Sequence, residues 1–234
     1  MTPTIVFDFD GTIAIGSGPV MAYAREVARA AADAALLERI EVALAAFESG
    51  DTRYRDGYDV VGSLAEDAGV DTAARSAAYQ ESRVQLGTAL APVEPVPGLA
   101  ELLAALRPHA RLVLATNAPA AGIEPLLERW GVRDGFDELR FAVGKPAGLE
   151  PVIRNALAEG PVLAIGDIVE YDLAPAMALG ADTALVGATA AHSPAAVTMR
   201  ALTLAELRGD IETWAATAAS ADPASNGAAT PIER

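Results

Sequence analysis

The sequence contains no cysteine. Disulfide bonds and thiol catalysis are therefore excluded, and nothing in the cysteine usage points to secretion. Basic residues are also scarce, with 17 Lys and Arg against 32 Asp and Glu and a formal net charge of −15. Because phosphate backbones attract basic surfaces, we expect no nucleic-acid partner.

Long apolar runs are missing as well. No stretch approaches the roughly 20 uninterrupted apolar residues that a bilayer-spanning helix needs, so we expect no membrane partner. The N-terminal residues carry no basic region and enter a strand-like run within four residues, which does not fit a signal peptide. A cytoplasmic location is the default expectation.

Apolar side chains, by contrast, make up 52% of the 234 residues. This is ample for a core, and the length suits one domain or a domain with an inserted module. Strand-like runs alternate with helical stretches, and they lie at 4–8, 112–116, 141–143, 162–166 and 183–187. Such alternation predicts an α/β fold in which a doubly wound, Rossmann-like parallel sheet lies between helices.

The strongest local signal follows the first of these runs. The run ending at Phe7 continues as DFDGT, from Asp8 to Thr12. Ionised carboxylates are costly to bury unless something pairs with them or coordinates them. One aspartate can attack an electrophile, a second can transfer a proton, and both can help to hold Mg²⁺. Asp8 and Asp10 therefore form a candidate catalytic centre.

More polar side chains stand just beyond the ends of the later runs. They are Thr116, Asn117, Lys145, Asp167 and Asp172. In open α/β sheets, ligands bind outside the carboxyl ends of the strands. We therefore expect a hydroxyl, an ammonium group and further carboxylates to meet Asp8 and Asp10 at one edge of the sheet.

This ordered set resembles the four motifs of the haloacid dehalogenase-like (HAD) hydrolase superfamily, whose members are mostly Mg²⁺-dependent phosphatases and phosphotransferases. The DxDGT motif matches residues 8–12, the strand-end Ser or Thr matches Thr116, the downstream Lys matches Lys145, and GDxxxxD matches residues 166–172. The resemblance covers about residues 4 to 187. It implies a phosphatase-type member with a helical cap inserted after the first strand.

The resemblance also implies the catalytic roles. Asp8 would attack phosphorus and form an aspartyl-phosphate, while Asp10 would protonate the leaving oxygen and later activate water. Lys145 would neutralise the charge of the nucleophile and of the phosphoryl group. The presence of Asp10 favours phosphoryl transfer over carbon–halogen cleavage, because dehalogenases of the superfamily do not keep an Asp two residues after the nucleophile.

The remaining matched residues would bind phosphate and metal. Thr116 and Asn117 would hold phosphoryl oxygens together with N–H groups of a helix opened at Pro119, although Asn117 could simply cap that helix. Mg²⁺ would be held by Asp8, by Asp10 through its backbone carbonyl, and by Asp167. Asp172 would join the metal shell or fix Lys145, and it could also cap a helix at 173–179.

Residues 15–95 break the alternation, with helical segments near 19–34, 35–48, 57–68 and 72–90 and no convincing strand. We therefore expect an all-helical cap at 15–96, a catalytic core made of 1–14 and 97–216, and a flexible C-terminal tail at 217–234. In the cap, Arg53 and Arg55 could grip a second anionic group of the substrate. The interpretation favoured for them is an exposed loop with internal charge pairs.

The function predicted is that of a Mg²⁺-dependent phosphatase acting on a small phosphorylated metabolite. Two alternatives stay open, a phosphomutase acting on a sugar phosphate and a non-catalytic protein that binds a phosphometabolite. The sequence names neither the substrate nor the oligomeric state.

Overall fold

The computed structural model describes residues 1–51 and 53–220. In this part of the chain, six strands form one parallel sheet in the order β5-β4-β1-β6-β7-β8. The strands are β1 (Thr4–Phe7), β4 (Arg111–Ala115), β5 (Glu138–Arg140), β6 (Val162–Gly166), β7 (Asp182–Leu185) and β8 (Met199–Arg200). The chain order reverses at β1, so the carboxyl end of β1 is a topological switch point, where ligands bind in such sheets.

Two apolar layers cover the sheet, because successive side chains of a strand point to opposite faces. Ile5 and Phe7 of β1 pack with α5 (Leu99–Leu106), α6 (Ile123–Arg129) and α9 (Arg208–Ser220). Val6 packs with α7 (Leu149–Glu159) and α8 (Ala174–Ala178). The predicted α/β fold, a parallel sheet with helices on both faces, is confirmed.

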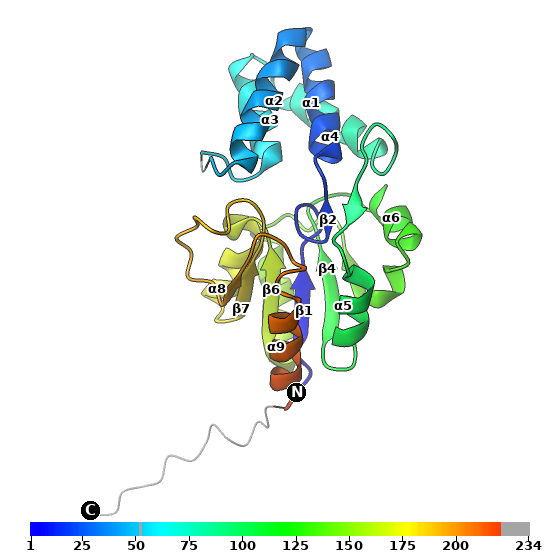
Figure 1. Ribbon diagram of the computed structural model, residues 1–234, viewed down its shortest axis with the longest axis vertical. Helices are drawn as coiled ribbons and strands as arrows, with labels where there is room; N and C mark the ends of the chain where they lie inside the picture. Colours follow the sequence, from blue (N-terminus) through cyan, green and yellow to red (C-terminus); the bar gives the residue numbers. More distant parts are fainter. Residues whose placement is uncertain (52, 221–234) are drawn as a thin grey trace, which may run out of the picture.

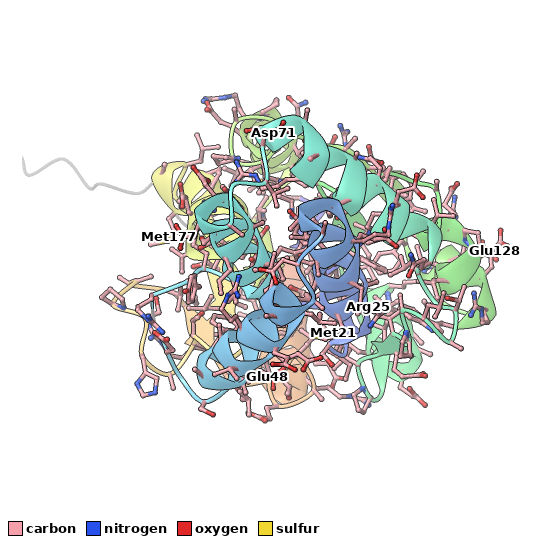
Figure 2. All side chains as sticks on the ribbon, turned by 90° about the horizontal axis from the view of Figure 1, so that it is seen from above. Met21, Arg25, Glu48, Asp71, Glu128 and Met177 are labelled. Carbon is pink, nitrogen blue, oxygen red and sulfur yellow. The ribbon has the colours of Figure 1, made fainter. Side chains whose placement is uncertain are left out.

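Helices α1 (Gly18–Ala31), α2 (Ala34–Glu48), α3 (Gly57–Asp67) and α4 (Thr72–Val84) are called the cap helices below. They enclose an apolar cluster of their own, separate from the two layers on the sheet. Figure 1 shows them above the carboxyl ends of the strands, and Figure 2, seen from above, labels Met21 on α1 and Glu48 on α2. The side chains of Asp33, Asp56 and Asp71 accept hydrogen bonds from backbone N–H groups where α2, α3 and α4 begin, which fixes these starts.

The cap helices join the sheet through a two-stranded ribbon. Strand β2 (Ala14–Ile15) pairs antiparallel with β3 (Glu94–Pro95). Gly18 lies so close to the second connection that a Cβ there would lie 2.0 Å from the carbonyl oxygen of Pro92. The expectation of no strand in 15–95 therefore misses this short pairing, and the proposed domain boundaries remain a prediction.

Several predicted elements are wrong in position. The third strand ends at Arg140 and not at 143, because Ala142 has a φ of 50°, which an extended strand cannot contain. The helix expected from Pro119 begins only at Ile123, and residues 117–122 form a loop. The helix expected to reach residue 90 ends at Val84. A 3₁₀ turn, η1 (Arg133–Gly135), leads from α6 towards β5.

The end of the chain also differs from expectation. Residues 217–220, predicted to begin a flexible tail, continue helix α9 to Ser220. The rest of the predicted tail, 221–234, lies outside the described residues. Within the residues described, no helix combines the length and the apolar character needed to cross a bilayer.

Candidate active site

The carboxyl end of β1 delivers Asp8 to the centre of the site. The backbone N–H of Asp8 donates to the carbonyl of Ile165 at 2.9 Å, which continues the pairing with β6. The chain then turns, and the carbonyl of Phe9 accepts hydrogen bonds from three successive N–H groups, those of residues 12–14. In this turn the hydroxyl of Thr12 donates to Asp8 Oδ2 at 3.3 Å. The strand end therefore holds the Asp8 carboxylate in a fixed, nearly buried position.

Lys145 is the cation of this centre. Its Nζ lies 2.6 Å from Asp8 Oδ1 and 2.7 Å from Asp172 Oδ1, and only 3% of its side chain is exposed. The loop that carries it is held by Asn117, whose Oδ1 accepts a hydrogen bond from the Lys145 backbone N–H at 2.7 Å. The role of Asn117 in this structure is thus to fix the lysine loop, and it does not cap a helix.

The end of β6 and the turn that follows it supply two more carboxylates. Asp167 follows the strand directly, and Asp172 lies in a widened helical turn, η2 (Val169–Leu173). Asp172 Oδ2 accepts a hydrogen bond from the backbone N–H of Ile168 at 3.0 Å. Asp172 therefore fixes Lys145 and its own loop, and it does not cap the helix expected at 173–179.

Gly166 makes the approach of Asp172 to the strand end possible. A Cβ at residue 166 would lie 2.2 Å from the Cβ of Asp172, a distance that no packed structure tolerates. Gly11 makes the approach of Asp167 to the turn after β1 possible, because a Cβ at residue 11 would lie 2.3 Å from Asp167 Oδ2. Both glycines of the sequence motifs are therefore needed for the carboxylates to gather.

The carboxyl groups of Asp8, Asp167 and Asp172, called the acidic cluster below, outnumber the one ammonium group of Lys145. One oxygen each from Asp8, Asp167 and Asp172 lie within 4.8 Å of one another. Burial and then the nearby carboxylates Asp172 and Asp10 raise the pKa of Asp8 to about 7, although Lys145 opposes the shift. Burial, followed by the charges of Asp8 and Asp172, also raises the pKa of Asp167 well above its ordinary value.

Lys145 stays protonated in this setting. Burial alone would lower the pKa of its ammonium group, but the adjacent carboxylates of Asp8 and Asp172 raise it above its ordinary value. Three carboxyl groups then face one ammonium group, and a divalent cation would balance the excess negative charge that they carry when ionised. Hard oxygen ligands are also the donors that Mg²⁺ prefers. The residues present therefore fit a divalent metal, held by Asp8 and Asp167.

Thr116 lies at the end of β4, as expected for a phosphate-binding hydroxyl. It is buried, and its Oγ1 accepts a hydrogen bond from the N–H of Ala118 at 3.1 Å, which leaves the hydroxyl proton free to donate. The helix N-terminus expected to assist it is absent, because residues 117–122 form a loop. Any help from backbone N–H groups must come from this loop.

Asp10 has a partner that the sequence did not suggest. Arg83, on cap helix α4, donates from Nη1 to Asp10 Oδ1 at 3.0 Å and to the hydroxyl of Tyr58 at 3.0 Å. The Asp10 carboxylate is thus bonded to a cap helix while it lines the same cavity as the acidic cluster. Tyr79 stands one helical turn before Arg83 on α4, with the guanidinium carbon 5.8 Å from its ring centroid. The sequence signal that could have indicated this contact was the spacing of Tyr79 and Arg83, an aromatic residue and a cation one turn apart on a cap helix.

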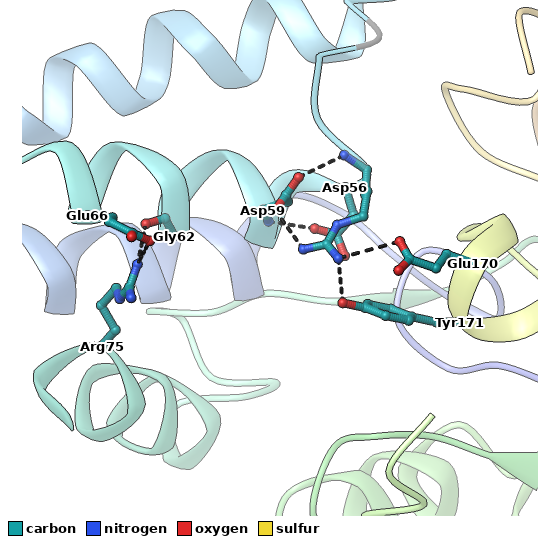
Figure 3. Close-up of polar contacts among 8 residues, drawn as sticks. Asp56, Asp59, Gly62, Glu66, Arg75, Glu170 and Tyr171 are labelled. Carbon is teal, nitrogen blue, oxygen red and sulfur yellow. Dashed lines mark hydrogen bonds and ion pairs between the residues drawn. The ribbon is translucent and has the colours of Figure 1, made fainter. Parts of the chain in front are cut away.

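The two arginines predicted to recognise substrate are placed differently. Arg53 is exposed and pairs with Asp51 at 2.6 Å, away from the site. Arg55 reaches the core, where it pairs with Glu170 at 3.6 Å and donates to the hydroxyl of Tyr171, while Asp59 holds its other end at 2.8 Å (Figure 3). Internal charge pairing, the interpretation favoured from the sequence, describes Arg53 and the pair of Arg55 with Asp59, but it does not account for the contacts of Arg55 with the core.

A cavity of about 700 Å³ lies between the cap helices and the carboxyl edge of the sheet. Its floor holds the predicted residues Asp8, Asp10, Thr116, Asn117, Lys145, Asp167 and Asp172. Arg55 lines it and Arg53 does not. The structure thus brings together all but one of the candidate residues around a single space.

Solved structures with the same fold come from several bacteria and an archaeon. The magnesium-bound HAD-hydrolase YfnB from Bacillus subtilis shares 19% identity, covers 90% of this chain and 98% of its own, and gives a TM-score of 0.57. A HAD phosphatase from Thermococcus onnurineus shares 19% identity, covers 90% of this chain and 98% of its own, and gives a TM-score of 0.54. A 2-haloacid dehalogenase from Pseudomonas syringae shares 19% identity, covers 92% of this chain and 100% of its own, and gives a TM-score of 0.52. Identities this low show the fold alone.

The comparison with curated proteins gave no match. The family model for haloacid dehalogenase-like hydrolases, however, matches residues 2–180, most of the chain. This range begins before Asp8 and ends beyond Asp172, so it contains every strand end that contributes to the acidic cluster. The chain belongs to the haloacid dehalogenase-like hydrolases.

Proposed function

We propose that this hydrolase is a Mg²⁺-dependent phosphatase that cleaves a small phosphomonoester through an aspartyl-phosphate on Asp8. The observation that carries the proposal is the setting of the Asp8 carboxylate. One of its oxygens is held by Lys145 Nζ at 2.6 Å, the other accepts from Thr12, and the side chain lines the cavity floor. A fixed carboxylate beside a buried cation suits attack on a negatively charged phosphoryl group.

The first step transfers the phosphoryl group to Asp8. An oxygen of the Asp8 carboxylate attacks phosphorus, the bond from phosphorus to the ester oxygen breaks, and that oxygen leaves with the bonding electron pair. Asp10, two residues further along the same turn, supplies a proton to the leaving oxygen. The positive charge of Lys145 and the hydroxyl of Thr116 stabilise the charge that spreads over the phosphoryl oxygens.

The second step releases phosphate. Asp10, now a carboxylate, takes a proton from water, and the water oxygen attacks phosphorus and frees Asp8. The ion pair with Arg83 holds the Asp10 side chain at the cavity, and this pair has to open when Asp10 carries a proton. Asp8, Asp167 and the backbone carbonyl of Asp10 would hold Mg²⁺, which supplies charge neutralisation for the phosphoryl group when bound.

Asp10 also supports phosphoryl transfer over the dehalogenase reaction of some relatives. A phosphate ester leaves as an alkoxide, which needs a proton, whereas a halide leaves without one. A protonatable carboxylate two residues beyond the nucleophile therefore serves the first reaction and has no evident use in the second. Among the described residues, Lys145 is the cation on the cavity floor, which suits a single phosphoryl group.

The test is phosphate release from a panel of small phosphomonoesters, measured with Mg²⁺ and with EDTA. We expect release with Mg²⁺, none with EDTA, and a loss of at least about 1000-fold in kcat for Asp8→Asn. Asp67→Asn, at an exposed position on α3, is the matched control and should behave as wild type.

Three results would reject the proposal. They are halide release from 2-chloropropionate without phosphate release, isomerised sugar phosphate without free phosphate, and full activity of Asp8→Asn. The first would indicate a dehalogenase and the second a phosphomutase.

A further inference from the structure

The part of the cavity formed by the cap helices differs in character from its floor. Its side chains are mainly apolar or aromatic and come from all of the cap helices; they are Val20, Met21, Leu44, Phe47, Tyr58 and Tyr79. Ile15, Ile168 and Val93 extend this surface from the connections and the core. An incoming ester would therefore place its phosphate among charges and its alcohol portion against hydrocarbon.

The aromatic part of this surface is neutral. Tyr58 and Tyr79 pack edge to face, with ring centroids 5.9 Å apart and an interplanar angle of 73°. Burial raises the pKa of Tyr79 to about 12, against the opposing charge of Arg83, so its phenol is not ionised at neutral pH. The hydroxyl of Tyr58 already accepts a hydrogen bond from Arg83. These two rings therefore offer the substrate aromatic surface and no charge.

The charges beside this surface disfavour a second anionic group on the substrate. Glu41, Glu48 and Asp56 line the cap side of the cavity, and all of them are acidic. Among the described residues that line the cavity, the cations are Lys145 and Arg55. Arg55 is already paired with Asp59 and Glu170 and donates to the hydroxyl of Tyr171, contacts that Figure 3 draws as dashed lines, and 44% of its side chain is exposed.

We propose, resting on the phosphatase function above, that the substrate is the monophosphate of an uncharged, largely apolar alcohol. The surface formed by Val20, Met21, Leu44 and Phe47 selects it by burying its hydrocarbon. A volume of about 700 Å³ accommodates a phosphate together with an alcohol of aromatic or medium-chain size. Phosphates that carry a carboxylate or a second phosphate are excluded by the acidic side chains around the cap wall.

The experiment compares kcat/KM for ethyl, butyl and hexyl phosphate and for 2-phenylethyl phosphate, with Mg²⁺ and below micelle concentrations. The polar comparison set is phosphoglycolate, glycerol 3-phosphate and glucose 6-phosphate. Transfer of one methylene from water is worth about fourfold in binding, so kcat/KM should rise about fourfold per methylene until the cavity is full. Phosphoglycolate should be slower than ethyl phosphate, which differs from it mainly by lacking a carboxylate.

Leu44→Asn should flatten the dependence on chain length, because it places an amide in the apolar surface. Phe47→Asn is a second, less buried variant that keeps the test available if Leu44→Asn does not fold. Val42→Asn is the matched control on the same helix, since Val42 is 73% exposed and does not line the cavity. It should leave the dependence on chain length unchanged.

The outcomes separate this inference from the function on which it rests. Turnover of every ester at similar rates, or a preference for glucose 6-phosphate or phosphoglycolate over hexyl phosphate, overturns the inference and leaves the phosphatase function intact. No turnover of any ester by folded wild-type protein overturns both. A steep dependence on chain length that persists in Leu44→Asn and Phe47→Asn would show that another surface buries the alcohol.

Discussion

Arg83 Nη1 lies 3.0 Å from Asp10 Oδ1 and so joins a cap helix to the turn that carries the proposed acid/base group. The arginine side chain is only 3% exposed and that of Asp10 is 24% exposed. The guanidinium group also has two nitrogens, Nε and Nη2, that are buried without a hydrogen-bond partner among the described residues. Movement of the cap helices away from the sheet would have to break this ion pair.

The pair predicts an energetic coupling between cap and core. Arg83→Met leaves the Asp10 carboxylate without its cation and should lower the free energy of unfolding. A double-mutant cycle with Asp10→Asn should give a coupling energy of about 1–2 kcal/mol, reduced from that of a fully buried pair because Asp10 is partly exposed. The measurement is urea unfolding of the four proteins in the same buffer. Additive effects of the two substitutions would contradict a direct interaction.

Gly11 provides a test of how closely the turn after β1 approaches Asp167. Gly11→Ala introduces a Cβ that would lie 2.3 Å from Asp167 Oδ2, in a backbone with a φ of +78°. Gly69→Ala is the matched control, because its φ is +80° and no atom lies within 4 Å of the new Cβ.

Both substitutions should cost roughly 1–2 kcal/mol of stability through the left-handed backbone. Only Gly11→Ala should also weaken Mg²⁺ binding, because only there must a carboxylate of the acidic cluster move. The measurement is Mg²⁺ titration by calorimetry beside thermal unfolding of each variant. Equal Mg²⁺ affinity in the two variants would contradict the close approach seen at Asp167.

Lys145 should be needed for stability as well as for catalysis. Lys145→Met leaves two buried carboxylates, Asp8 and Asp172, without their cation, and should lower stability by about 3–5 kcal/mol. Adding Asp172→Asn removes one of these charges and should recover part of the stability without recovering activity. Urea unfolding in EDTA, together with phosphate release in Mg²⁺, separates the two effects. Wild-type stability of the single variant would mean that Lys145 does not balance these carboxylates.

The raised pKa values predict how the metal-free protein responds to pH. Burial and the neighbouring carboxylates raise the pKa of Asp8 to about 7, from 3.8, and that of Asp167 in the same direction. Between pH of about 4 and 7 the folded state therefore binds more protons than the unfolded state, so stability should fall as pH rises through this window.

Asp167→Asn should weaken this pH dependence, because an amide does not titrate. The measurement is the melting temperature in EDTA at several pH values for both proteins, which cancels the titration of groups that do not interact with Asp167. Parallel curves for the two proteins would contradict the assignment to Asp167. Added Mg²⁺ should stabilise the wild type most at the upper end of the window, where the carboxylates are ionised.

The sheet and most of its polar edge were predictable because their signals are local. An apolar run that ends in Asp8 or in Asp167 marks both a buried strand and the chemistry at its end. The alternation of these runs with helices then places the ends at one edge. Errors arose where the apolar pattern continued past the strand, as at 141–143, where the backbone at Ala142 leaves the extended region.

Contacts between distant parts of the chain were not predictable. Arg83 is 73 positions from Asp10 in the sequence, and no local pattern connects them. Asn117 looked like a helix cap, and only the fold shows that its amide holds the loop of Lys145, 28 positions further on. Arg53 and Arg55 looked equivalent in the sequence, and only the fold shows that Arg55 lines the cavity and Arg53 does not.

The ribbon formed by β2 and β3 allows the segment between these two strands, which contains the cap helices, to vary independently of the sheet. Ala14 and Pro95 are register partners, so the chain leaves the core and returns to it at adjacent points. A segment that begins and ends at the same place can be shortened, lengthened or replaced without shifting the pairing of β1 with β4 and β6. The surface proposed to meet the alcohol portion of a substrate can therefore diverge over evolutionary time while the carboxylates beneath it stay in register.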